Sequence, residues 1–163
     1  MPNSRMPVLS HVDRNGKARM VDVSAKALMR RKATVRGTVK LSPEAFSAIQ
    51  HQQLMKGDAL TVAHIAGIQA AKRTHELIPL CHPLPLEHVT LTVDLDEVAS
   101  AVHIICETTV TAKTGIEMEA FVGASVAALT LYDMVKAIDP FAIITDVKLM
   151  KKTRGKMICA PPW

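Results

Sequence analysis

The stretch "HVTLTVDLDEVASAVHIICETTVTAK" (residues 88–113) decides the fold, because both of its halves alternate apolar and polar side chains. Alternation with a period of two is typical of a strand that buries one of its faces. Between the halves, Ala99-Ser100 can form a turn. The stretch therefore predicts a β-hairpin, around which the other elements have to be arranged.

Strands and helices are expected on both sides of this hairpin. The segment "ATVRGTVKL" (33–41) also alternates and predicts a first strand. Ser42-Pro43 marks a helix start, with serine as N-cap and proline at the first helical position, and Asp58 can cap a second helix. We expect helices at about 43–54 and 59–77, a proline-shaped loop at 78–88, a helix within 112–137 and a last strand at 143–152.

This order of elements predicts the fold class. If the first two helices share one layer, the chain reads β-α-β-β-α-β, a ferredoxin-like α+β sandwich with an antiparallel sheet and helices on one face. The other face of such a sheet is bare, and apolar residues there would favour oligomerisation. A stripe of small residues would let the helix at 59–77 approach a neighbour closely: Ala59, Ala63, Ala66, Gly67, Ala70 and Ala71.

The composition is that of a globular protein with one domain. The chain has 163 residues, of which 48% are hydrophobic and 21% are charged. Residues 1–31 are polar and interrupted by prolines, so we expect a mobile N-terminal arm followed by a single domain at 32–163. We expect no membrane span, because no apolar run looks long enough to cross a bilayer. The three cysteines form no CxxC pair, which favours a reducing cytoplasm.

The net charge of +5 favours an anionic partner. Three Phe, one Tyr and one Trp cannot build much of a platform for stacking nucleic-acid bases. We therefore expect a small phosphorylated substrate and neither nucleic acid nor a membrane as partner.

Four charged residues stand out in the apolar segment 112–137. Asp133 and Lys136 are three positions apart and share a helix face, so they form either a surface ion pair or a partly buried pair in which desolvation lowers the pKa of the lysine. Glu117 and Glu119 would share a side of an extended segment but lie about 200° apart in a helix. Acidic residues in a first helical turn can also simply stabilise the helix dipole.

The loop "PLCHPL" (79–84) holds His82 beside Cys81, with prolines on both sides. His82 could bond a backbone carbonyl, transfer protons, contact a phosphate or bind a metal. Metal binding is the weakest alternative, because no further Cys or His lies at a recognised spacing. Lys56 precedes a helix start, where an anion site is plausible. Near the C-terminus, Lys152, Arg154 and Lys156 form either a solvated strand end or a phosphate clamp.

Several long segments resemble the molybdenum-cofactor biosynthesis protein C family, almost without gaps from Met20 to Lys156. They are "MVDVSAKA" (20–27), "KGDAL" (56–60), "AHIAGIQAAKRTHELIPLCHPL" (63–84), "KTGIEMEAFVGASVAALTLYDMVKA" (113–137) and "RGK" (154–156). One segment departs, because "KKTRGKMI" stands where the family usually has the glycine-rich "KSGGKSG".

The resemblance implies a cytoplasmic lyase, cyclic pyranopterin monophosphate synthase, which converts 3′,8-cyclo-7,8-dihydro-GTP into cyclic pyranopterin monophosphate and releases pyrophosphate. It also implies a ferredoxin-like catalytic domain and a hexamer, a trimer of dimers with sites between subunits. By motif, the catalytic residues are Asp133, Lys136 and Lys56. The substrate-binding residues are Leu80, Cys81, His82, Glu117, Met118, Glu119, Lys26 and Lys156, and Arg73 can add a further cation.

The implied chemistry consists of proton transfers and displacements, so we expect no required cofactor and no protein-bound metal, while Mg²⁺ could accompany the substrate phosphates. Two alternatives stay open. A binding module on the same fold would bind many polyanions without turnover. A metal-dependent hydrolase using Cys81 and His82 would lose its activity on chelation.

Overall fold

The fold is built on one antiparallel sheet. The structure, a computed structural model, describes residues 15–157, with side chains up to Gly155. Within this range the strands are β1 (Met29–Lys40), β2 (His88–Asp96), β3 (Ala101–Ala112) and β4 (Ile143–Met157), in the order β2-β3-β1-β4. The predicted hairpin is confirmed, because His88 pairs with Thr109 and Asp96 pairs with Ala101.

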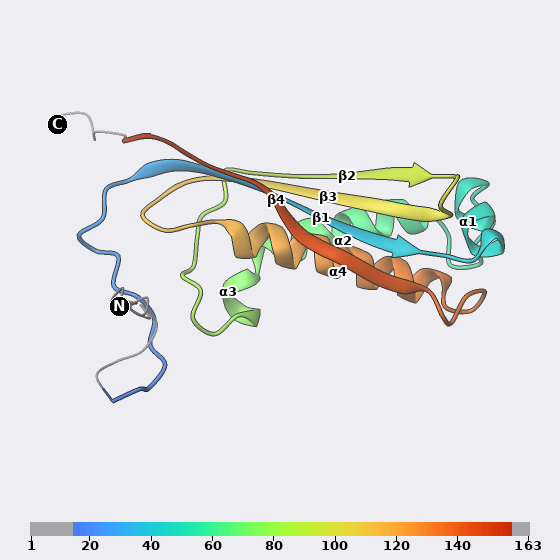
Figure 1. The fold of residues 1–163 in the computed structure, drawn as a ribbon, viewed down its shortest axis with the longest axis horizontal. Coiled ribbons are helices and arrows are strands. Elements are labelled where there is room, and N and C mark those ends of the chain that lie inside the picture. The colour runs from blue at the N-terminus through green and yellow to red at the C-terminus, as the bar shows by residue number, and fades with distance from the viewer. Residues whose placement is uncertain (1–14, 158–163) are drawn as a thin grey trace, which may run out of the picture.

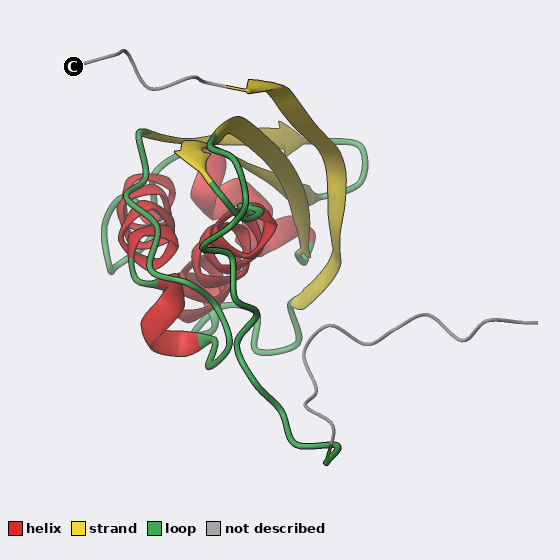
Figure 2. Ribbon diagram, turned by 90° about the vertical axis from the view of Figure 1, so that its left-hand side faces the viewer, coloured by secondary structure: helices red, strands yellow, loops and turns green. Residues whose placement is uncertain are grey.

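Helices cover one face of this sheet (Figure 1, Figure 2). The two long ones are α2 (Ala59–Lys72) and α4 (Glu117–Val135). The strand order and this one-sided cover confirm the ferredoxin-like α+β sandwich. One detail differs, because α1 (Pro43–Gln50) lies at the end of the sheet in Figure 1 instead of sharing the layer of α2.

The predicted helix starts are confirmed by their caps. Ser42 Oγ accepts a hydrogen bond from Ala45 N at 3.2 Å, and Asp58 Oδ1 accepts one from Thr61 N at 3.0 Å. The helix ends were predicted less well. The first helix stops at Gln50, and the predicted helix 59–77 breaks at Arg73, beyond which α3 (Thr74–Leu77) forms a separate turn.

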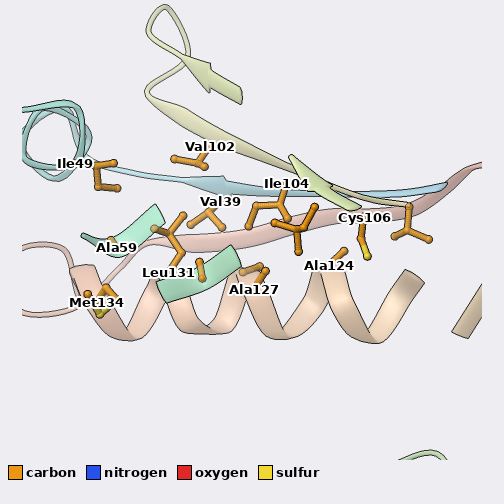
Figure 3. Packing of buried hydrophobic residues seen from close by; sticks show 14 of the residues in the cluster. Val39, Ile49, Ala59, Val102, Ile104, Cys106, Ala124, Ala127, Leu131 and Met134 are labelled. Atoms are coloured by element: carbon orange, nitrogen blue, oxygen red, sulfur yellow. The ribbon is translucent and has the colours of Figure 1, made fainter. Parts of the chain in front are cut away.

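Two glycines allow α2 and α4 to pack with their backbones close together. A Cβ added at Gly123 would lie 2.7 Å from Cys106 Sγ and 3.2 Å from Gly67 O, and a Cβ at Gly67 would lie 2.8 Å from Gly123 O. The small-residue stripe of α2 is therefore a packing surface, as predicted. Figure 3 shows Ala124 of α4 directed toward the sheet, and Ala127 lies against Gly67 of α2.

The face of the sheet that no helix covers is polar at its centre. Arg36 donates from Nη2 to His103 Nδ1 at 2.9 Å, and His103 Nε2 lies 3.5 Å from Asp96 Oδ2. Beside them, Lys32 Nζ lies 2.6 Å from Glu107 Oε1. The central residues of this face are therefore polar, and they do not form the apolar surface that would favour oligomerisation.

Helix α4 corrects the reason that was given for expecting no membrane span, since one apolar segment is long enough. By length and composition alone it could cross a bilayer, because 18 consecutive residues of it have a mean hydropathy of 1.3. However, 56% of this segment is buried inside the fold, where α4 packs on the sheet and on α2. Its apolar character is accounted for by its place in the core.

Candidate functional site

A cavity of about 330 Å³ lies where α4 begins. It brings together seven of the predicted substrate-binding residues, which come from three separate segments of the chain: Lys26, Leu80, Cys81, His82, Glu117, Met118 and Glu119. Val21, Leu84, Thr114 and Gly115 complete its lining. The grouping of these residues, predicted by resemblance to lie in one site, is thus found in the fold.

Helix α4 opens directly onto this cavity. Its N-cap residue, Ile116, makes no side-chain cap, and the preceding Thr114 and Gly115 line the cavity themselves. Thr108 fixes the start of the helix by donating from Oγ1 to Ile116 O at 3.3 Å. The first backbone N–H groups of a helix have no backbone partner within it, and in α4 the N–H groups of Ile116, Glu117 and Glu119 are bonded by the carboxyl groups of Glu117 and Glu119.

The segment that precedes β1 forms the second wall of the cavity. His82 Nε2 and Val21 O form a hydrogen bond at 2.9 Å, and Lys113 Nζ donates to Ser24 O at 2.5 Å. These two contacts hold the segment so that Lys26 lines the cavity. Of the alternatives open for His82, the structure shows the bond to a backbone carbonyl, in a position that also faces the cavity. The expected mobility of residues 1–31 stays a prediction, although β1 already begins at Met29.

The two glutamates of the "EME" motif have different surroundings. Glu117 forms an ion pair with Lys152 of β4; burial alone would raise its pKa, but the bonds from Lys152 and from the backbone bring the pKa below its ordinary value. Glu119 is only 4% exposed, and its Oε2 has no hydrogen-bond partner. Burial, with a smaller effect from the charge of Glu117, raises the pKa of Glu119 to about 7. Burial and the charge of Glu119 also raise the pKa of Cys81.

The three residues predicted to be catalytic form a second cluster at the C-terminal end of α4. Asp133 Oδ1 lies 2.7 Å from Lys136 Nζ, and its Oδ2 lies 2.8 Å from Lys56 Nζ. Lys56 Nζ also donates to Asp133 O at 2.7 Å. All three side chains are about half-exposed in the single chain. The sequence brought Asp133 and Lys136 together by spacing, whereas the contact with Lys56 depends on the fold.

The protonation state of this cluster corrects one sequence-based alternative. Hydrogen bonds from Lys136 and Lys56 lower the pKa of Asp133 to about 2. The hydrogen bond to Asp133 raises the pKa of Lys136, opposite to the lowered value that a desolvated lysine would have. In the single chain the pair is therefore ionised, and only Glu119 among the four charged residues of this helical segment is buried.

The two clusters lie at opposite ends of one helix. Glu117 and Asp133 belong to the first and last turns of α4, which at 1.5 Å per residue places their backbones about 24 Å apart. A small molecule held in the cavity therefore cannot contact the Asp133 cluster of the same chain.

Of the two remaining predicted binding residues, Arg73 lies outside the cavity, and Lys156 has a side chain that the structure does not describe. Arg73 stands between α2 and α3, where its side chain is exposed and bonds Glu76 at 2.8 Å. Lys156 belongs to β4, and its side chain lies outside the described part of the structure.

Lys152, which the sequence singled out only within a basic segment, is the lysine of β4 that reaches the cavity, through its ion pair with Glu117. The alternation of side chains along β4 could have identified Lys152. This residue pairs with Ala33, whose side chain faces the core, so both side chains lie on the helix-covered face of the sheet.

Among the described residues, metal ligands do not gather near Cys81 and His82. Within residues 15–157, no group of three or more His, Cys, Asp or Glu side chains is placed to hold a metal ion. Cys81 and Cys106 are both free thiols. The alternative of a metal-dependent hydrolase therefore receives no support from the geometry of this region.

Comparisons with known proteins match the chain over almost all of its length. A family model described as the MoaC family matches residues 20–155. The cyclic pyranopterin monophosphate synthase of Heliobacterium modesticaldum is 52% identical over 151 residues, which cover 93% of this chain and 95% of that protein. The protein of the same name from Roseiflexus castenholzii is 51% identical, covering 93% and 96% of the two chains. The cyclic pyranopterin monophosphate synthase 3 of Mycobacterium tuberculosis is 49% identical, covering 94% and 86%.

Proposed function

This chain belongs to the MoaC family, and we propose that it is a cyclic pyranopterin monophosphate synthase acting in molybdenum cofactor biosynthesis. In this reaction 3′,8-cyclo-7,8-dihydro-GTP becomes cyclic pyranopterin monophosphate and pyrophosphate leaves, so the enzyme is a lyase. One observation carries the proposal: seven residues assigned to substrate binding on motif alone line one cavity in a chain about half identical to proteins of this name.

The charges around the cavity suit a triphosphate attached to a nitrogen-rich ring. Lys26 lines the cavity, and Lys152 reaches it through Glu117. Lysine provides a point charge for phosphate oxygens, and a carboxyl group can bond ring N–H groups. No cofactor is required in this proposal, and Mg²⁺ would enter only with the substrate phosphates. Cys81 and Cys106 are free thiols, which supports a cytoplasmic location.

We further propose that each complete site is shared by two copies of the chain. Asp133, Lys136 and Lys56 are implied to act on the same substrate as the cavity residues, yet they lie at the far end of α4. In a two-fold pair of chains, the cavity of one copy can face the Asp133 cluster of the other, and the reciprocal site forms at the same time. This arrangement fits the trimer of dimers implied by the resemblance. Light scattering should then give the mass of a hexamer, and a monomer at micromolar concentration would exclude the shared site.

The proposed activity can be tested with the purified chain and the cyclic GTP derivative. We expect equal amounts of pyrophosphate and cyclic pterin product, with the rate unchanged by a chelator in the absence of added Mg²⁺. Tight, salt-sensitive binding of many polyanions without any product would favour the binding module instead. Activity that is lost on chelation and restored by a transition metal would favour the hydrolase.

A further inference from the structure

The cavity holds two carboxyl groups that the fold treats in opposite ways. Glu117 is partly exposed and paired with Lys152. Glu119 is almost fully buried, and its Oε2 has no partner although its residue lines the cavity. A buried polar atom without a partner is costly, and such atoms in native proteins often mark a place that a ligand or a reacting group fills.

Among the residues that the structure describes around Glu119, no cation forms an ion pair with its carboxyl group. On its own helix the neighbouring charge is Glu117, which is negative. From the loop 78–87 come the Cys81 thiol and His82, whose Nε2 bonds Val21 O. From the N-terminal segment comes Lys26, which lines the same cavity without an ion pair to Glu119, and Lys152 of β4 bonds Glu117 instead.

We propose that Glu119 is a catalytic residue that carries a proton at neutral pH and delivers it to a ring nitrogen of the bound substrate, whereas Glu117 stays ionised and only binds. This inference rests on the proposed function. Two carboxyl groups whose surroundings separate their protonation states are a recurrent way to build an acid beside a fixed negative charge.

The proton step balances within the hydrolytic opening of the nitrogen ring. As a ring C–N bond breaks, its electron pair passes to the nitrogen, which takes the proton from the Glu119 carboxyl. A water molecule adds to the carbon through its oxygen and gives one proton to the Glu119 carboxylate. One water is consumed, one N–H and one C–OH are formed, and Glu119 regains its proton. The raised pKa of Glu119, about 7, allows both directions of transfer near neutral pH.

Glu119→Gln separates binding from proton transfer, because the amide keeps the shape and hydrogen-bonding capacity but cannot supply an acidic proton. We expect kcat to fall by about 10²–10⁴-fold, with KM within about threefold of the parent value. In the parent enzyme kcat should decline above about pH 7, because Glu119 loses its proton there. We expect this decline to be absent in Glu119→Gln. Glu117→Gln is the matched control, for which we expect a raised KM and the same decline of kcat above about pH 7 as in the parent. A Glu119→Gln enzyme with kcat within threefold of the parent would overturn the proposal.

Infrared difference spectra between parent and Glu119→Gln, recorded from pH 5 to 9 without substrate, give a reading independent of turnover. We expect the C=O band of a protonated carboxyl to disappear with a midpoint near pH 7. A band absent across this whole range would overturn the proposal. A parent enzyme that shows the band but makes no product would instead contradict the proposed function. Should Glu119→Gln not fold, Glu119→Asp takes its place: we expect a lower kcat that keeps its pH dependence, and a profile without that dependence would overturn the role.

Discussion

The buried carboxyl of Glu119 should make the stability of the protein depend on pH in a predictable direction. Its pKa rises from 4.5 in the unfolded chain to about 7 in the fold, so the folded state binds the proton more tightly. The stabilisation from this proton is fully present below about pH 4.5 and is lost as pH rises through 7. Between pH 5 and pH 8 the loss amounts to roughly 2–3 kcal/mol, since one pKa unit corresponds to about 1.4 kcal/mol.

Glu119→Gln removes this dependence, because the amide stays neutral at every pH. Urea unfolding of parent and variant at pH 5, 6, 7 and 8, at one fixed protein concentration, measures the difference directly. We expect the free energy of unfolding of the variant to gain about 2–3 kcal/mol relative to the parent across this range. Glu117→Gln is the matched control and should not show this gain, because Glu117 has a lowered pKa. If parent and Glu119→Gln change in parallel with pH, Glu119 is ionised in the fold and the reasoning fails.

Three further predictions concern other parts of the molecule. Asp133→Asn, Lys136→Met and the double variant should lose similar amounts of turnover at saturating substrate, since residues that act as one unit are not additive; independent losses that multiply would contradict this. Gly123→Ala should lower the free energy of unfolding by about 1–3 kcal/mol, because its Cβ would lie 2.7 Å from a buried sulfur, whereas the matched Gly37→Ala meets only ordinary contacts at 3.6 Å; equal effects in denaturant titrations would refute the packing argument. His82→Ala should leave the fold intact but raise KM and speed hydrogen exchange in residues 20–28, because the bond from His82 to the backbone of that segment is lost. Unchanged exchange there would show that His82 does not hold this segment in place.

Much of the fold could be predicted because its signals are local. The alternation in 88–113 and the caps at Ser42 and Asp58 each lie within a few residues, and each was confirmed. The position of α1 at the end of the sheet could not be predicted, since it depends on contacts with distant segments. One of these is the bond from Ser42 N to Asp139 Oδ2 at 2.7 Å, which ties the start of α1 to the loop after α4.

The motifs could name candidate site residues, whose roles stay predictions, but not how the fold divides these residues between two places. Motifs named Glu117, Glu119, Asp133, Lys136 and Lys56, and the fold gathers them into two groups. Nothing in the letters "EME" distinguishes a paired glutamate from a buried, unpaired one. That difference arises from a lysine on β4, 35 residues further along the chain, which reaches one of the two glutamates only after the sheet has formed.

The central claim is that one active site is built from the cavity of one chain and the Asp133 cluster of another, and co-assembly of two inactive variants tests it most directly. Glu119→Gln and Asp133→Asn chains carrying different affinity tags would be expressed together, and assemblies holding both would be purified. If sites are shared within two-fold pairs, a mixed pair contains one doubly altered and one unaltered site, so random pairing should restore about a quarter of the parental turnover. Mixed assemblies as inactive as either variant alone would contradict the shared site.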